Sequence, residues 1–180
     1  MGLLEFATWL QSTSLSVTIQ SIGWVVPLLQ SVHILGIGVV FVSVLMTALR
    51  VLGRVRMEQS LAEVWHRFAP FLWWGLAVMA LTGVLLTISE PVREFMTLSF
   101  RLKLLLLVVG LASAVLFGRR VGRAAGAGAG ANQVPAGMRI AAIATVVLWL
   151  AIIFLGRAIA YDDVIWGEWS PAVLAGADAT

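Results

Sequence analysis

Four long apolar runs constrain the fold of this chain more than any other feature of its sequence. They cover residues 24–49, 70–88, 101–117 and 140–158. A helix needs about 20 predominantly apolar residues to cross a bilayer, and 61% of the 180 residues are hydrophobic while 12% are charged. The chain is therefore predicted to be an all-α integral membrane protein, a four-helix bundle built as a single membrane domain over residues 1–180.

The residues before the first run are too polar and too interrupted to span a membrane. Apolar side chains recur there at helical spacing, at Leu3, Phe6, Ala7 and Leu10. This pattern predicts a short amphipathic helix over residues 2–20 that lies in the membrane interface. No Lys or Arg precedes Arg50, so the N-terminus lacks the basic segment of a cleavable signal peptide. The first span is expected to be retained.

Arginine placement predicts the orientation. Two loops, between the first and second spans and between the third and fourth, carry eight of the twelve basic residues: Arg50, Arg54, Arg56, Arg67, Arg119, Arg120, Arg123 and Arg139. Loops rich in Lys and Arg stay in the cytoplasm. Both termini are therefore expected outside, in a multi-pass protein of the cytoplasmic membrane. The basic charge indicates topology and does not indicate a nucleic-acid partner.

Three connecting segments have local signals. Ser99 is a plausible N-cap for the third helix. Residues 124–131 alternate Ala and Gly and predict a flexible loop. Residues 161–180 read as a polar tail, in which Asp162 and Asp163 are poor candidates for a buried acid–base pair.

His33 is the main candidate functional residue, because it is an ionisable side chain inside the first span. Such residues are costly at membrane depth and usually face the bundle interior. Two interpretations remain open. His33 is a ligand for haem iron or another metal, or its imidazole makes a hydrogen bond across helices to a Ser, a Thr or a carbonyl.

Met79 and Gly36 extend the ligand interpretation. Met79 lies nine residues inside the outer end of the second span, as His33 does in the first, so both are about 13 Å deep. A His and Met pair is a known axial set for haem iron. Gly36, one turn from His33, would leave room for a planar macrocycle or for a neighbouring helix. The simpler role for Met79 is to fill the core.

Three cations lie near the outer ends of the third and fourth spans: Arg101, Lys103 and Arg157. Positive charge in the first turns of a helix opposes the helix dipole and favours an anionic partner. The partner would be Glu90 or Glu94, a lipid phosphate, or the propionates of a haem held at the depth of His33. Snorkelling to lipid is a further possibility for these long side chains.

Several function classes are disfavoured. The chain has no cysteine, which excludes thiolate metal sites and cysteine nucleophiles. The second histidine, His66, lies roughly 20 Å from His33 along the membrane normal, so the two cannot share one metal. No carboxylate lies within a predicted span, which argues against a proton-coupled transporter. No motif assigns an enzyme class.

Four short motifs carry a resemblance to a known family. They are residues 32–36 (VHILG), 48–53 (ALRVLG), 82–86 (TGVLL) and 100–103 (FRLK). The chain resembles an uncharacterised family of small bacterial four-helix membrane proteins, and is more distantly similar to copper-resistance D-type and transmembrane cytochrome b-type bundles. The resemblance implies a bacterial inner-membrane location and a haem b or copper role, with His33 matching the histidine of the first helix.

Two functions follow as hypotheses. One is a membrane electron-transfer protein with a single haem b in its outer half, held by His33 with Met79 as second ligand. The other is a non-catalytic membrane subunit or scaffold of a larger complex, in which His33 is structural and the outer segments meet a membrane or periplasmic partner. Copper handling has less support, because the methionines are dispersed.

Overall fold

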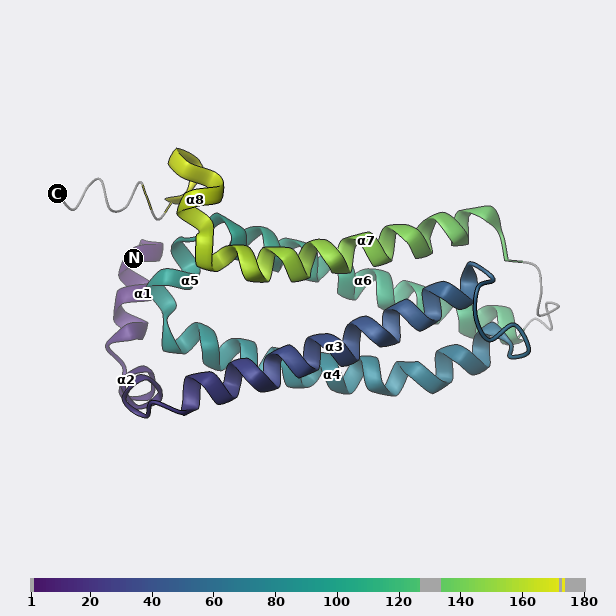
Figure 1. Cartoon of the computed structure of the whole chain (residues 1–180), viewed down its shortest axis with the longest axis horizontal. Coiled ribbons are helices and arrows are strands. Elements are labelled where there is room, and N and C mark those ends of the chain that lie inside the picture. The colour runs from purple at the N-terminus through teal and green to yellow at the C-terminus, as the bar shows by residue number, and fades with distance from the viewer. Residues whose placement is uncertain (1, 127–133, 172, 174–180) are drawn as a thin grey trace.

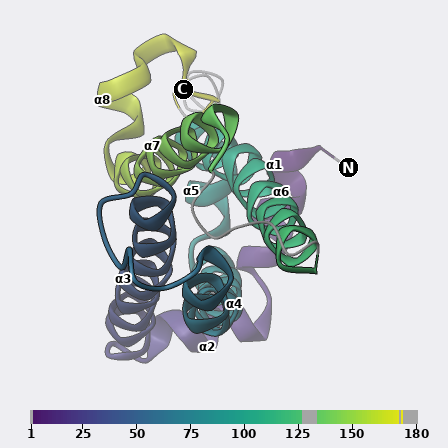
Figure 2. The same cartoon turned by 90° about the vertical axis from the view of Figure 1, so that its right-hand side faces the viewer.

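Four long helices form the body of the molecule in the computed structural model, which describes residues 2–126, 134–171 and 173 (Figure 1). They are α3 (Val25–Val51), α4 (Leu61–Ser89), α6 (Leu98–Gly126) and α7 (Ala136–Ala158). Each is long and apolar enough to cross a membrane. Viewed along the bundle, α3 lies beside α4 and α7, and α6 lies beside α7 and α4 (Figure 2). The predicted all-α membrane bundle is confirmed.

The helices extend beyond the apolar runs that predicted them. The helix α4 begins nine residues before residue 70, because Ser60 and Glu63 form a reciprocal cap. Pro70 lies inside this helix. The helix α6 starts at Leu98 and continues through residues 124–126, which were predicted to belong to a loop. The remainder of that predicted loop, 127–131, lies outside the described residues.

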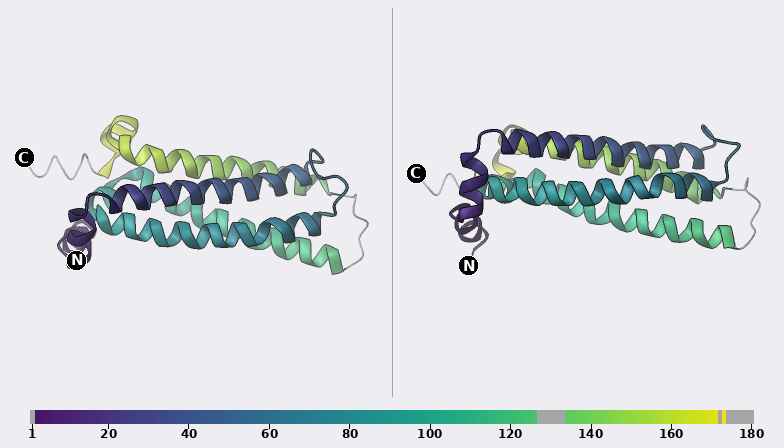
Figure 3. Two further views of the ribbon diagram at one scale, coloured as in Figure 1. Left: turned by 60° about the horizontal axis from the view of Figure 1, so that its bottom comes forward. Right: turned by 90° about the horizontal axis from the view of Figure 1, so that it is seen from below.

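Shorter segments cover one end of the bundle. The predicted amphipathic helix over 2–20 is two helices, α1 (Leu3–Gln11) and α2 (Ser14–Ser21), separated at Ser12 and Thr13 because the Thr13 hydroxyl caps α2. Both run across the long helices at that end (Figures 1 and 3). The helix α5 (Pro91–Met96) joins α4 to α6 there. We call α1, α2, α5 and residues 159–171 the terminal cap, and the opposite end the arginine end.

Residues 159–171 pack against the start of α6 instead of forming the predicted polar tail, while residues 172 and 174–180 of that tail lie outside the described residues. The packed segment forms η1 (Ile159–Tyr161), α8 (Asp162–Trp166) and η2 (Gly167–Trp169). Asp162 is only 2% exposed. Its carboxylate accepts hydrogen bonds from the backbone N–H groups of Leu98 (3.1 Å) and Ser99 (2.8 Å) and from the Ser170 hydroxyl. Asp162 thus serves the free N–H groups at the start of α6, the role that the sequence suggested for Ser99.

Glycines allow α3 and α4 to pack closely. A Cβ atom added at Gly75 of α4 would lie 2.8 Å from Val40 Cγ2, and one added at Gly36 of α3 would lie 2.9 Å from Met79 Cγ. Both distances are too short for real Cβ contacts. Val40 and Met79 belong to the buried core that the four long helices share. Small residues in this way bring two membrane helices into close contact.

Candidate functional site

His33 lies in the interface between α3 and α4, half-buried, near the terminal cap. Its Nδ1 atom is 2.8 Å from the hydroxyl oxygen of Thr82 on α4. The same hydroxyl lies 2.8 Å from the carbonyl oxygen of Val78 and donates to it, as Thr residues in helices commonly do. With the hydroxyl hydrogen used in this way, Nδ1–H of His33 is the donor to Thr82 and Nε2 keeps its lone pair.

A glycine lets the imidazole approach α4. A Cβ atom added at Gly83 would lie 3.4 Å from Cε1 of His33, at the short end of ordinary van der Waals contact. The ring therefore sits against the backbone of α4, with Thr82 at one edge. Both residues were part of the motif at 82–86, but the sequence did not identify Thr82 as the partner of His33.

Met79 lies one helical turn further from the terminal cap than Thr82 and Gly83. Its side chain packs against Gly36, where its Cγ atom fills the notch that was predicted to leave room for a macrocycle or for a neighbouring helix. Met79 is buried. The structure thus places His33 opposite Thr82 and Gly83, and Met79 opposite Gly36, in successive layers of one helix interface. Met79 occupies the position of a core residue.

Depth counting with the observed helix ends explains this pairing. His33 is eight residues after the start of α3, and Thr82 is seven residues before the end of α4. Met79 is ten residues before that end. Because α3 and α4 are antiparallel, residues at equal depth face one another. Equal depth with His33 therefore falls at Leu81, one residue from Thr82 and two from Met79, so the observed helix ends bring the count close to Thr82 without singling it out.

The three predicted cations do not converge on His33. Arg101 is exposed and its Nε atom donates to the carbonyl of Phe95 at 3.1 Å. Arg157 is exposed, lies over the ring of Tyr161 and donates to its hydroxyl at 3.2 Å. Lys103 alone is partly buried, near enough to His33 to interact with it electrostatically. A Cβ atom added at Gly156 of α7 would lie 3.4 Å from Lys103 Nζ.

Glu94 of α5 is the anionic neighbour of Lys103. Burial raises the pKa of the Glu94 carboxyl, while the nearby charges of Lys103 and Arg93 act to lower it. Glu90, the other predicted partner, instead forms an ion pair with Arg93 at 2.7 Å. Lys103 therefore interacts electrostatically with Glu94 at the junction of the bundle and the terminal cap, and with His33 inside the bundle.

His66 is exposed and belongs to the arginine end. It precedes Gly83, which contacts His33, by 17 residues of α4, or about 25 Å of helix. The two histidines are thus far apart, as the sequence predicted. Within the described residues, no three His, Cys, Asp or Glu side chains are grouped so that they could hold a metal ion.

This architecture defines a helical integral membrane protein in which a histidine–threonine hydrogen bond and two glycine contacts join a pair of spanning helices. The chain belongs to a family of unknown function, DUF6644, whose model matches residues 6–162. None of the curated proteins and none of the solved structures is significantly similar to it.

Proposed function

We propose that this protein is a non-catalytic membrane subunit of a larger complex, and that His33 is a structural group within it. The observation that carries the proposal is the hydrogen bond from His33 Nδ1 to Thr82. It gives His33, an ionisable group within the first apolar run, a partner on the neighbouring helix. Such interhelical bonds stabilise membrane bundles. The bond lies beside the Gly36–Met79 and Gly75–Val40 contacts, so one continuous interface holds α3 to α4.

The terminal cap is the surface that would meet the partner. It is held to the bundle by the hydrogen bonds of Asp162 and by edge-to-face packing of Phe95 against Phe6 and Phe100. It also presents exposed apolar side chains on a fixed backbone: Val164 is 78% exposed and Trp169 is 82% exposed. Rigid, exposed aromatic and aliphatic side chains are typical of protein interfaces.

Native electrophoresis of the full chain tests this proposal. The tagged protein, extracted from its own membranes in mild detergent, should migrate as a complex larger than the chain. The cap variants Val164→Lys and Trp169→Glu should dissociate it. Met57→Glu is the matched control, because Met57 is also exposed but lies at the arginine end. His33→Gln should keep the complex, since Gln can also donate to Thr82. A chain that migrates alone, or a His33→Gln variant that loses its partner, would contradict the proposal.

Haem b electron transfer is the second candidate, favoured by the Nε2 atom of His33, for which no described residue provides a hydrogen-bond partner. Metal-bound histidines commonly donate their other ring N–H to a protein acceptor, as His33 does to Thr82. The resemblance to cytochrome b-type and copper-resistance D-type bundles also supports it. His33 fits one axial position, and Lys103 would pair with a propionate. Met79 fills the notch at Gly36, so the macrocycle would have to lie elsewhere around the ring.

An absorbance spectrum separates the two candidates. Haem b would give a Soret band and a reduced α-band that both disappear in His33→Ala. If the protein purified from haem-replete cells is colourless, haem binding is excluded and the structural role of His33 is retained. Metal analysis after copper loading tests copper binding on the same preparation.

The location that fits this role is the bacterial inner membrane, with the terminal cap outside. Arginines of the two loops gather at the arginine end, which the positive-inside rule assigns to the cytoplasm. The chain has no cysteine, so single cysteines can report its orientation. Ser12→Cys in the cap and Glu58→Cys in the α3–α4 loop are both at exposed positions. In spheroplasts, a membrane-impermeant maleimide should label the first and not the second; the reverse pattern would invert the topology.

A further inference from the structure

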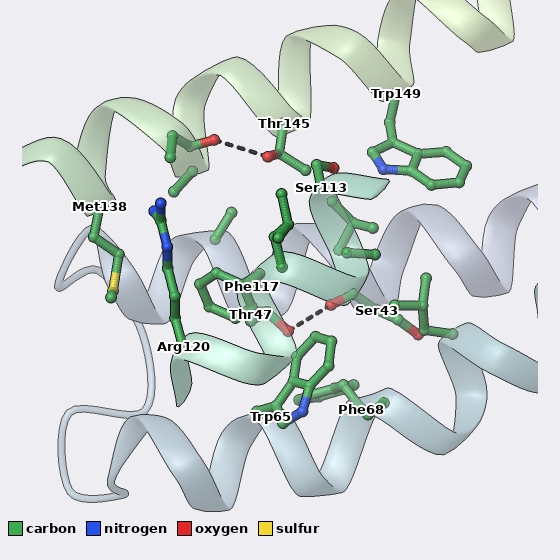
Figure 4. Close-up of a pocket in the computed structure, with 18 residues that line it drawn as sticks. Ser43, Thr47, Trp65, Phe68, Ser113, Phe117, Arg120, Met138, Thr145 and Trp149 are labelled. Atoms are coloured by element: carbon green, nitrogen blue, oxygen red, sulfur yellow. Dashed lines mark hydrogen bonds between the residues drawn. The ribbon is translucent and has the colours of Figure 1, made fainter. Parts of the chain in front are cut away.

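A cavity of about 230 Å³ lies inside the bundle, toward the arginine end (Figure 4). All four long helices contribute to its wall, through residues such as Thr47 of α3, Trp65 of α4, Phe117 of α6 and Trp149 of α7. None of the residues around it belongs to the His33 region. Since a water molecule occupies about 30 Å³ of liquid, the cavity has room for a molecule of one or two rings.

The hydroxyl groups of the cavity wall are already committed as donors. Each donates to a carbonyl of its own helix, at 2.7 to 2.9 Å: Ser43 to Val39, Thr47 to Ser43, Ser113 to Gly110 and Thr145 to Ala141. The rest of the wall is mostly apolar, and its aromatic part includes Trp65 packed edge-to-face on Phe117 with 5.3 Å between the ring centroids. The hydroxyls therefore offer a ligand no hydrogen to share.

Trp149 is the exception. Its side chain is 2% exposed, yet among the described residues its Nε1 atom has no hydrogen-bond partner. Figure 4 shows the indole nitrogen on the side of the ring that faces Ser113 and Thr145, two other residues of the cavity wall. Leaving a buried N–H unpaired costs about 1–3 kcal/mol. A hydrogen-bond acceptor that reaches Nε1 from the cavity would remove this cost.

Arg120 provides the second polar feature, at the other end of the cavity. It is exposed, and Figure 4 shows its guanidinium beside Met138 at the arginine end. On α6 it follows Ser113 by seven residues, which corresponds to about 10 Å along the helix. The cavity therefore runs from a buried N–H donor to a cation at the membrane boundary, between aromatic walls.

We propose that this cavity binds a lipid-soluble aromatic carbonyl compound of the quinone type. One carbonyl oxygen accepts the hydrogen bond from Trp149 Nε1, the planar ring lies against Trp65 and Phe117, and the outer side of the ligand faces Arg120. A phospholipid with its phosphate at Arg120 would place methylene groups at Trp149, about 10 Å deeper, and would leave the N–H unpaired. The unpaired indole thus favours a carbonyl ligand over an acyl chain. This site is independent of the role of His33.

Indole NMR of the full chain in nanodiscs tests the proposal. The chain has eight tryptophans, and Trp149→Phe assigns the signal of Trp149. The probe is 2-methyl-1,4-naphthoquinone, and 2-methylnaphthalene is the same ring system without carbonyl groups. The quinone should shift the Trp149 N–H signal, whereas the hydrocarbon should not. Trp149→Phe should bind the quinone about five- to tenfold more weakly, since one hydrogen bond contributes about 1 kcal/mol.

Controls keep this test decisive. Trp74→Phe is the matched variant, because Trp74 is 75% exposed on the same bundle and is absent from the cavity wall; its affinity should be unchanged. Where Trp149→Phe fails to fold, the shift of the Trp149 signal in the unaltered chain still decides. The proposal is overturned if the quinone does not shift the Trp149 N–H signal, or if the hydrocarbon binds as tightly as the quinone. It is also overturned if oleate displaces the quinone and shifts the Trp149 N–H signal as much as the quinone does.

Discussion

The Nδ1 atom of His33 lies 2.8 Å from the hydroxyl oxygen of Thr82. This contact connects two spanning helices through residues that are 49 positions apart in the sequence. The Thr82 hydroxyl in turn donates to the Val78 carbonyl. Thr82 therefore accepts from one helix while it donates within the other. This arrangement favours the tautomer of His33 that carries its hydrogen on Nδ1, and it makes Thr82 as important to the candidate site as the histidine.

Replacing Thr82 by Val should destabilise the bundle. The change keeps the shape of the side chain and removes the acceptor for His33, so a polar group is left unpaired at membrane depth. Interhelical hydrogen bonds of this kind average about 0.6 kcal/mol and reach about 1.7 kcal/mol, and the loss should fall in that range. Unfolding in mixed detergent and SDS micelles measures it.

Thr82→Ser is the control, because the hydroxyl remains. In a double-mutant cycle with His33→Phe, the two losses should not add, since either change removes the same bond. Strictly additive effects would show that the two side chains do not interact.

The glycine contacts predict a ranked series. Gly75→Ala places a methyl group 2.8 Å from Cγ2 of Val40, a stiff β-branched side chain, and should cost about 1–3 kcal/mol. Gly36→Ala meets the flexible side chain of Met79 at 2.9 Å and should cost less. Gly38→Ala on α3 is the matched control, because nothing lies within 4 Å of the added atom. The free energy of unfolding should be lowest for Gly75→Ala. If another of the three variants is less stable, this account of the α3–α4 contact is wrong.

The buried carboxylate of Asp162 should be needed to hold the terminal cap. In Asp162→Asn, the charge is lost and an amide N–H₂ group faces the N–H groups of Leu98 and Ser99. A lost charge-assisted cap is expected to cost about 1–3 kcal/mol. Thermal unfolding in detergent and amide exchange at Leu98 and Ser99 both report it.

Asp163→Asn provides the comparison, because Asp163 is the adjacent acid and is exposed. It should unfold within a few tenths of a kcal/mol of the parent chain, as most exposed substitutions do. Equal effects at positions 162 and 163 would contradict the assignment of Asp162 as the cap.

The number of spanning helices followed from the apolar runs, since a bilayer requires about 20 apolar residues for each crossing. The helix ends did not follow, because helices continue past the hydrocarbon core wherever polar caps support them. Ser60 and Glu63 extend α4 in this way. The same uncertainty displaced the residue level with His33 from Leu81, next to Thr82, to Met79.

Long-range contacts account for what the sequence could not indicate. Asp162 reads locally as part of a polar tail, and its burial depends on N–H groups 63 and 64 residues earlier in the chain. The cavity at Trp149 needs all four helices to be placed before it exists. The sequence predicted an anionic partner for Lys103, and Glu94 is close enough for its carboxyl to interact with the Lys103 charge.

Glu94 predicts a pH dependence of stability. Burial raises the pKa of its carboxyl above the ordinary value of 4.5, so the folded state binds the proton more tightly than the unfolded state. The stability contributed by Glu94 is therefore fully present below pH 4.5 and is lost as the pH rises through the raised pKa. Glu94→Gln removes this dependence. Melting temperatures of both proteins from pH 4 to 8 should show the parent chain losing stability relative to Glu94→Gln across that window.

Lys103→Met sharpens the same measurement. The charge of Lys103 lowers the pKa of Glu94 and so opposes the effect of burial. Without that charge the pKa of Glu94 rises further, and the loss of stability should move to higher pH and span a wider interval. In the double variant with Glu94→Gln, the shifted interval should disappear, because the titrating group is gone. If Lys103→Met has the same dependence of stability on pH as the parent chain, Lys103 and Glu94 are not electrostatic partners. Lys103 would then need a different anion at the junction between the bundle and the terminal cap.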